Sequence, residues 1–317
     1  MDILERVSMA GVIPVIKIED PAYAIPLANA IMAGGIRTIE VTVRNDTAFQ
    51  SISLIHENVP GMMVGAGTIL TPEMVDQAVA AGADYIVAPG LNLPTVRRCK
   101  ELNIPIVPGC VTPSEIQTAI DEGLKVLKFF PAGTLGGVEA IKLMAGPFPG
   151  VKFVPTGGIT YDNLQEYLSC KAVAACGGSY MAKADLIKAE AWDQITDNCR
   201  KAVNLAMGYR LLHVGINHDS EDEAAAAAQR LAALFNLPVR NCSKSVFADP
   251  YVENMKFKFY GEKGHIGFKT LSLDRAVKYL RAVGVEFNEE SCQYDAAGKL
   301  SCIYLKEEIG GFAIHLV

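Results

Sequence analysis

The sequence has no run of about 18 apolar residues, the length that a transmembrane helix needs, so we expect no membrane partner. It has no cluster of lysine and arginine, and its net charge of -6 excludes the basic surface typical of nucleic-acid-binding proteins. None of its eight cysteines forms a Cys-x-x-Cys pair, and their apolar neighbours are typical of reduced thiols in a cytoplasmic protein. The first residues lack a basic segment followed by an apolar run, so we expect no signal peptide.

The composition is that of a large α/β protein. Half of the 317 residues are hydrophobic and 28 are glycine, which suits a well-buried core with many tight turns, and the length is sufficient for two domains. Short apolar runs alternate with amphipathic segments over residues 11–179. We predict strands at residues 12–18, 38–43, 63–68, 85–89, 104–109, 126–131, 153–158 and 173–179.

Eight such repeats in roughly 190 residues predict a (β/α)8 TIM barrel over residues 1–208. A doubly wound open sheet is the alternative, but eight evenly spaced repeats favour closure. Thr71-Pro72 and Thr112-Pro113 each place a capping side chain before a proline suited to the first helical turn. A helix over residues 185–207 is expected to end this domain.

The pattern changes near residue 209 and predicts a small second α+β domain over residues 209–317. A strand at residues 212–217 and an alanine-rich helix to about residue 235 are followed by a strand at residues 255–260. A second cycle has a strand at 264–270, a helix at 273–283 and strands near 285–289, 300–305 and 312–317. The predicted elements of residues 209–317 form two βαβββ repeats, of which the first is less clear.

A single lysine interrupts an apolar and aromatic segment, residues 126–131, which we predict to be a buried strand. Burial disfavours the charged form of an ammonium group, and a lysine that is partly neutral near pH 7 is a nucleophile towards ketones. Lys128 is therefore a candidate for Schiff-base chemistry. The alternative is that its side chain merely extends from the strand end to water, as most lysines do.

Charged residues also stand near the end of the second predicted strand. Alternation places Glu40, Thr42 and Arg44 on one face, and a strand covered by helices can point charges only towards the barrel interior. Glu40 is a candidate acid and base, and the planar guanidinium of Arg44 suits a substrate carboxylate. The alternative is that the glutamate and the arginine form a structural ion pair.

Glycines end four of the other predicted strands. Those at residues 65–67 and 90 are expected to let a ligand approach the backbone closely. Gly157-Gly158 and Gly177-Gly178 end the seventh and eighth strands, where barrels commonly bind phosphate through backbone N–H groups. We therefore expect a phosphate site at this end of the barrel.

Residues 1–207 resemble the class I 2-keto-3-deoxy-6-phosphogluconate (KDPG) aldolase family, which also includes 4-hydroxy-2-oxoglutarate aldolase activity. The resemblance is carried by five segments that occur in order: residues 40–44, 65–68, 128–132, 155–159 and 177–179. It implies a homotrimeric barrel with no cofactor that cleaves a small 2-keto sugar acid phosphate to pyruvate and glyceraldehyde 3-phosphate. Cleavage of 4-hydroxy-2-oxoglutarate to pyruvate and glyoxylate would use the same chemistry.

The resemblance also implies roles for individual residues. Lys128 becomes the Schiff-base lysine and Glu40 the group that carries protons. The remaining site residues fall into three groups: Arg44 and Thr68 for the carboxylate, Pro89 and Phe130 for the pyruvyl pocket, and Gly157, Gly158, Gly178 and Ser179 for the phosphate.

The doubled βαβββ pattern resembles a short vicinal-oxygen-chelate (glyoxalase-like) domain. His213 and His265 occupy ligand positions of that family, and His315 stands where the family usually has glutamate. Three histidines on strands suit Zn²⁺, Ni²⁺, Fe²⁺ or Mn²⁺, and Glu253 is a candidate for a further carboxylate ligand. The alternative is an assembly or regulatory module whose histidines bind nothing.

Two rival functions stay open at this point. A 6-phospho-2-dehydro-3-deoxygalactonate aldolase would need the same lysine, glutamate and phosphate site. A non-catalytic sensor of sugar acid phosphates would need the pocket but not a buried lysine, so Lys128 argues against it.

Overall fold

The computed structural model describes residues 3–317, so Met1 and Asp2, which open the segment searched for a signal peptide, lie outside it. The chain forms two compact units, Met1–Ala206 and Met207–Val317. Within the described residues, no helix has both the length and the apolar character that crossing a bilayer requires.

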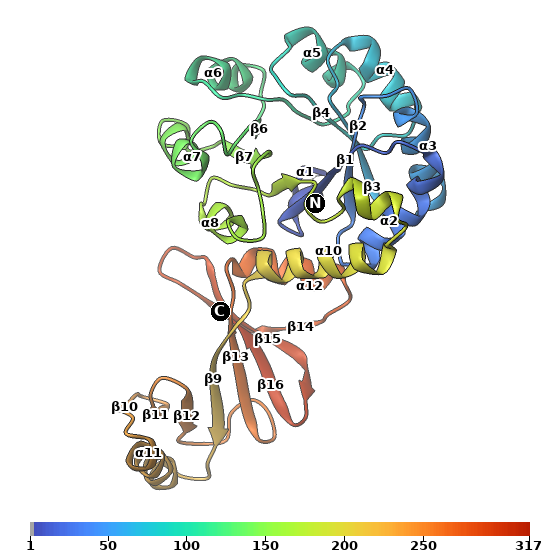
Figure 1. The fold of residues 1–317 in the computed structure, drawn as a ribbon. Coiled ribbons are helices and arrows are strands. Elements are labelled where there is room, and N and C mark those ends of the chain that lie inside the picture. The colour runs from blue at the N-terminus through green and yellow to red at the C-terminus, as the bar shows by residue number, and fades with distance from the viewer. Residues whose placement is uncertain (1–2) are drawn as a thin grey trace. The chain divides into compact units, whose positions relative to one another are not determined.

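The first unit is a ring of parallel strands surrounded by helices (Figure 1). A six-stranded sheet of order β5-β4-β3-β2-β1-β8 is joined to the pair β6-β7 by single bridges between Gly109 and Lys128 and between Thr156 and Gly177. The bridges close the ring, which confirms the predicted barrel. The strands are β1 (Val12–Ile16), β2 (Thr38–Thr42), β3 (Met63–Gly67), β4 (Tyr85–Val87), β5 (Ile106–Val107), β6 (Val126–Phe129), β7 (Lys152–Pro155) and β8 (Cys176–Gly178).

Helices follow the strands around the barrel. Thr71 and Thr112 cap α4 and α6 as predicted, since each hydroxyl accepts a hydrogen bond from a backbone N–H in the first turn. The helices are α1 (Ile3–Ser8), α2 (Ala24–Ala33), α3 (Ala48–Asn58), α4 (Pro72–Ala80), α5 (Leu93–Glu101), α6 (Pro113–Asp121), α7 (Gly137–Ala145), α8 (Leu164–Ser169), α9 (Ala184–Lys188) and α10 (Trp192–Met207), with a 3-10 turn at Pro21–Tyr23.

The single helix predicted over residues 185–207 is wrong. The structure has α9 and α10 in its place, separated by Glu190, whose φ of +51° lies in the left-handed region. The residues between the two helices are good helix formers, so intrinsic propensity gave no sign of the break.

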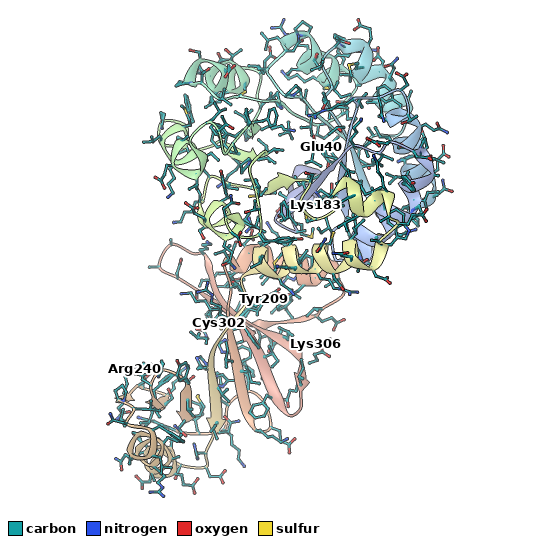
Figure 2. The ribbon with its side chains drawn as sticks, in the orientation of Figure 1. Glu40, Lys183, Tyr209, Arg240, Cys302 and Lys306 are labelled. Carbon is teal, nitrogen blue, oxygen red and sulfur yellow. The ribbon has the colours of Figure 1, made fainter. Side chains whose placement is uncertain are left out.

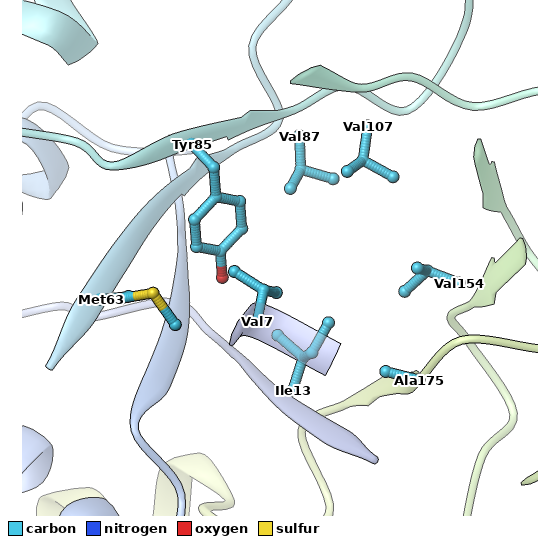
Figure 3. Close-up of a cluster of buried hydrophobic side chains, with 8 residues drawn as sticks. All are labelled: Val7, Ile13, Met63, Tyr85, Val87, Val107, Val154 and Ala175. Atoms are coloured by element: carbon cyan, nitrogen blue, oxygen red, sulfur yellow. The ribbon is translucent and has the colours of Figure 1, made fainter. Parts of the chain in front are cut away.

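A cluster of apolar side chains fills one part of the barrel interior (Figure 3). Val7 of α1 joins side chains that point inward from the strands, and the Tyr85 hydroxyl lies 2.9 Å from Thr38 Oγ1. Burying a valine or isoleucine side chain stabilises the fold by about 1.5–3 kcal/mol, so this cluster holds the strands together. Its members are Val7, Ile13, Met63, Tyr85, Val87, Val107, Val154 and Ala175.

The second unit is a mixed eight-stranded sheet of order β10-β11-β12-β9-β13-β16-β15-β14. The two central strands, β9 and β13, are antiparallel, and each has a parallel neighbour, β12 or β16. The βαβββ order therefore occurs twice. Its elements are β9 (Arg210–Asn217), α11 (Glu221–Phe235), β10 (Val239–Asn241), β11 (Ser245–Ala248), β12 (Val252–Met255), β13 (Gly264–Lys269), α12 (Leu273–Ala282), β14 (Phe287–Tyr294), β15 (Leu300–Ile309) and β16 (Phe312–Leu316).

The strand predicted at residues 255–260 is wrong, because β12 ends at Met255. The aromatic residues that suggested a strand pack instead against one another: the Phe259 and Tyr260 rings lie 4.6 Å apart. Strands β10 and β11 were both missing from the predicted pattern. All three residues of β10 are exposed, so they show no hydrophobic alternation.

Candidate active site and metal centre

Lys128 and Glu40 face each other across the barrel. Lys128 Nζ donates a hydrogen bond of 3.1 Å to Glu40 Oε1, and the two residues are only 6% and 3% exposed. Lys128 lies on β6 and Glu40 on β2, so residues 88 positions apart meet in the interior. The free-energy cost of removing both charged groups from water offsets much of their electrostatic attraction, so the pair adds little to stability. A buried pair of this kind is a candidate for a catalytic role.

Two glycines of β3 leave space for the side chains around this pair. A β-carbon at Gly67 would lie 2.8 Å from Glu40 Cγ, and one at Gly65 would overlap the Tyr85 ring. The sequence had suggested that these glycines let a ligand approach the backbone. The space is taken instead by the Glu40 carboxylate and the Tyr85 phenol.

Arg44 lies at the barrel mouth, two residues beyond β2, and does not form the structural ion pair considered above. Its Nε donates a hydrogen bond of 3.4 Å to Thr68 Oγ1, while Glu40 contacts Lys128. Thr68 has a φ of +63°, a left-handed conformation that is rare for a β-branched residue and is typical of functional sites. The guanidinium and the hydroxyl together present donors suited to a carboxylate.

All ten residues predicted for the barrel site line one cavity of about 630 Å³, together with others that the sequence had not identified. The predicted ten are Glu40, Arg44, Thr68, Pro89, Lys128, Phe130, Gly157, Gly158, Gly178 and Ser179. Lys17, Lys183 and Thr156 are additions. Lys17 comes directly after β1, so the rule that barrel sites form at strand ends could have found it. Lys183 stands beyond β8, directly before α9, and only the fold brings it to the cavity.

The Gly157-Gly158 turn, where the sequence predicted a phosphate site, has a left-handed backbone. Gly157 and Gly158 have φ values of +88° and +82°, which favour glycine, and they begin two residues after the end of β7. A β-carbon at Gly158 would lie 3.1 Å from Gly133 Cα, so the turn also packs closely against the next loop. These features leave backbone N–H groups close to the cavity with no side chain between.

In the second unit, the three predicted histidines and Glu253 meet at one point. His213 Nε2 lies 3.1 Å from His265 Nε2 and 3.2 Å from His315 Nε2. Glu253 Oε2 lies 3.2 Å from His213 Nε2 and 3.1 Å from His265 Nε2. The four side chains come from the four central strands β9, β12, β13 and β16, two from each βαβββ copy.

Two glycines leave space for the side chains of this His/Glu cluster, which consists of His213, His265, His315 and Glu253. Gly267 pairs with His213 on one side and His315 on the other, and Gly215 pairs with Glu253 and His265. A β-carbon at Gly215 would lie 2.5 Å from His265 Nε2. The His-x-Gly sequence that opens each copy thus supplies one histidine of the cluster and leaves space for the neighbouring side chains.

Three members of the cluster, His213, His315 and Glu253, have shifted pKa values that favour metal binding. Burial, with the neighbouring histidines, lowers the pKa of His315 to about 3, and burial also lowers the pKa of His213. Burial alone would raise the pKa of Glu253, but hydrogen bonds from His265 and Ser245 and nearby histidine charge reverse this, and the net pKa is lowered. Near pH 7 these groups are therefore neutral imidazoles and a carboxylate, the forms that bind cations.

Neighbouring side chains hold Glu253 and His315 of the cluster in place. Ser245 Oγ donates a hydrogen bond of 2.6 Å to Glu253 Oε1, and Cys302 Sγ lies 3.4 Å from His315 Nδ1. The Tyr304 ring stacks on His315 with 4.8 Å between ring centroids. Such outer contacts orient ligands towards a metal.

Comparison with known proteins agrees with the geometry of the barrel. The family model described as KDPG and KHG aldolase matches residues 3–198. The 2-dehydro-3-deoxy-phosphogluconate aldolase of Dickeya dadantii is 42% identical over 200 residues, which are 63% of this chain and 94% of that protein. The KHG/KDPG aldolase of Escherichia coli K12 is 44% identical over 192 residues, 61% of this chain and 90% of that protein.

A solved structure gives the same result. The KDPG aldolase of Legionella pneumophila, captured with pyruvate as a covalent carbinolamine intermediate, is 38% identical, with a TM-score of 0.60 over 62% of this chain and 97% of that one. The matched family segment covers almost the whole barrel and well over half of the chain. The chain therefore belongs to the KDPG and KHG aldolase family.

Proposed function

We propose that the barrel is a class I aldolase that cleaves 2-keto-3-deoxy-6-phosphogluconate to pyruvate and glyceraldehyde 3-phosphate. The observation that carries this proposal is the buried contact of 3.1 Å between Lys128 Nζ and Glu40 Oε1 inside the cavity. Schiff-base catalysis needs an amine nucleophile and a group that moves protons within hydrogen-bond reach of it. Lys128 and Glu40 meet both requirements.

The reaction begins at the C2 carbonyl of the substrate. Neutral Lys128 attacks the carbon, the C=O π electrons move to oxygen, and a carbinolamine forms. Glu40 carries one proton from the nitrogen to that oxygen and then donates the proton that it took from the Lys128 ammonium before the attack, so the oxygen leaves as water and an iminium remains. Arg44 and Thr68 hold the neighbouring carboxylate, so that C2 is presented to the lysine.

Cleavage follows because the iminium accepts electrons. Glu40, directly or through water, removes the proton of the C4 hydroxyl, and the electrons of that O–H bond form the aldehyde C=O. The C3–C4 bond breaks and its electron pair moves into the iminium, which gives an enamine. Glyceraldehyde 3-phosphate leaves, C3 is protonated, and water releases pyruvate and free Lys128.

The same chemistry would cleave 4-hydroxy-2-oxoglutarate to pyruvate and glyoxylate, and the C4 epimer of the phosphogluconate substrate. Assays of the three substrates side by side would rank them. We also propose, from the family resemblance, that the protein is a cytoplasmic homotrimer, which light scattering would test by a mass three times that of the chain.

Covalent trapping tests the aldolase proposal. Borohydride with pyruvate should add a reduced pyruvyl group to the wild-type protein, located at Lys128 by peptide mass spectrometry. The Lys128→Met variant should show neither the added mass nor turnover. Normal turnover in that variant, or loss of wild-type activity in EDTA, would contradict the proposal.

For the second unit we propose a divalent metal site formed by His213, His265, His315 and Glu253. Metal–ligand bonds of about 2.1 Å place neighbouring ligands about 3.0–3.4 Å apart, and four of the six distances between the four ligand atoms are 3.1–3.2 Å. Three imidazoles and a carboxylate suit Zn²⁺, Ni²⁺, Fe²⁺ or Mn²⁺, and such an ion would act there as a Lewis acid. The doubled βαβββ order is in keeping with a vicinal-oxygen-chelate-like module.

Elemental analysis tests the metal site. The purified chain should hold close to one equivalent of metal, and the triple variant His213→Ala, His265→Ala, His315→Ala should hold none. His56→Ala is the matched control, since His56 lies on α3 of the barrel. Equal metal content in all three proteins would remove the proposal, and the barrel's aldolase activity would be unaffected by that result.

A further inference from the structure

The described side chains that line the barrel cavity carry more positive than negative charge. They include four cations, Lys17, Arg44, Lys128 and Lys183, and the carboxylate of Glu40. Glu40 is committed to Lys128, which it contacts at 3.1 Å. The other three cations have no acidic partner among the described residues that line the cavity, so they can bind an anionic ligand there.

These cations occupy two sides of the cavity. Arg44 follows β2 and contacts Thr68 at the end of β3. Lys17 follows β1, while Lys183 lies five residues beyond β8, just past Ser179. Since β8 and β1 are neighbours in the barrel, the two lysines share the side on which Ser179 lies. Arg44 serves the carboxylate side and the lysines serve the phosphate side.

The two lysines differ in how they are engaged. Lys17 Nζ lies 3.6 Å from Glu19 Oε1, so part of its charge is already balanced. Lys183 has no ion-pair or hydrogen-bond partner for its ammonium among residues 3–317, and its side chain is exposed at the cavity. Its flexible stem can bring the charge to a ligand as a point charge.

We propose that Lys183 determines the preference for a substrate with a terminal phosphate. This inference rests on the proposed aldolase function and adds a side chain to the backbone groups of Gly157 and Gly158. A phosphate monoester carries about two negative charges near pH 7, and lysine is a usual partner for it. A substrate that ends in a hydroxyl gains nothing from the ammonium, so Lys183 separates the two classes. Figure 2 labels Lys183 and Glu40 among the side chains of the barrel.

Kinetics with two matched substrates test the inference. We expect Lys183→Met to lower kcat/KM for 2-keto-3-deoxy-6-phosphogluconate about tenfold, mainly through KM, because one charge-assisted contact is lost. Activity on 2-keto-3-deoxygluconate, the same molecule without phosphate, should not change. Lys183→Arg should restore most of the preference. Lys188→Met is the control, because Lys188 lies on α9, the short helix that follows Lys183, contacts Glu19 and does not line the cavity.

Equal losses on both substrates, or no loss on the phosphorylated one, would overturn the inference. Failure of the aldolase proposal would look different, because pyruvate trapping at Lys128 requires no phosphate and would be absent in the wild type. In that event, calorimetric titration with glyceraldehyde 3-phosphate still decides the role of Lys183. Its affinity should fall about tenfold in Lys183→Met, and an unchanged affinity would reject the role.

Discussion

Gly67 supplies the space that the Glu40 carboxylate occupies. The two residues lie on the neighbouring strands β3 and β2, where Gly67 pairs with Thr42, and a β-carbon on Gly67 would lie 2.9 Å from Glu40 Cδ. That distance is shorter than a carbon–carbon contact allows, so the carboxylate depends on the missing side chain. The position of Glu40, the proposed proton carrier, is thus set partly by a residue with no functional group.

The Gly67→Ala variant should lose activity because its methyl group pushes Glu40 away from Lys128. A displacement of about 1 Å in an active site can cost about 100-fold in rate, so we expect a loss of that size in kcat. Gly150→Ala is the control, since a β-carbon there would meet no atom within 4 Å. Equal activity of the two variants would show that Glu40 does not depend on this space.

Replacing Glu40 should separate covalent binding from cleavage. Glu40→Gln keeps the shape of the side chain but cannot carry protons, so we expect turnover to fall about 10²- to 10⁴-fold. Trapping of pyruvate by borohydride should persist at Lys128, more slowly, because the amine that forms the bond is still present. A variant that is trapped and still cleaves at the normal rate would assign proton transfer to another group.

The His/Glu cluster should respond to a methyl group at Gly215. A β-carbon there would lie 2.5 Å from His265 Nε2, so Gly215→Ala should displace the imidazole and abolish metal binding. Gly298→Ala provides the comparison: its φ of +74° makes alanine unfavourable, but a β-carbon would meet no atom within 4 Å. We expect that control to lose stability and keep its metal, as measured by elemental analysis. Metal retained in Gly215→Ala would contradict the cluster geometry.

Acid should destabilise the metal-free second unit through His315. Its pKa is lowered from 6.5 to about 3, so between these values the unfolded chain binds more protons than the folded one. Stability is therefore fully present above pH 6.5 and falls as the pH drops towards 3. The loss amounts to about 2 kcal/mol at pH 5.

Urea unfolding in EDTA at pH 7 and pH 5 measures this effect, with His315→Gln as the comparison that cannot titrate. Trp192, the only tryptophan, lies on α10 of the barrel, so its fluorescence follows the first unit. The pH-dependent shift should appear in circular dichroism and be absent from the fluorescence transition. The same shift in wild type and His315→Gln would assign the acid sensitivity elsewhere.

Much of the barrel site could be predicted because parallel strands of a barrel end on the same side. Once Glu40, Lys128 and the Gly157-Gly158 turn were assigned to strand ends, the fold could only bring them together. The structure places all ten predicted residues in one cavity, and their individual roles stay predictions. The three histidines of the second unit were predicted as ligands from the resemblance of the doubled βαβββ pattern to a vicinal-oxygen-chelate domain.

Other features depended on contacts that no local pattern contains. Glu190 ends a helix within a run of helix-forming residues, and the exposed strand β10 has no apolar alternation. Glu253 could be named only as a candidate, because the first βαβββ copy could not be aligned reliably. The interpretation of Gly65 and Gly67 as ligand contacts was wrong because the competing side chains come from other strands.

The sequence by itself determined the alternation of strands and helices, the strand that carries Lys128 and the end of each strand at which chemistry could occur. These properties follow from periodicity and turn residues, which act over a few neighbouring positions. Only the tertiary structure decided that Glu40 contacts Lys128, that Lys183 reaches the cavity and that Glu253 joins the three histidines. Those contacts join residues far apart in the chain, and their distances are set by barrel closure, sheet register and the space that glycines leave open.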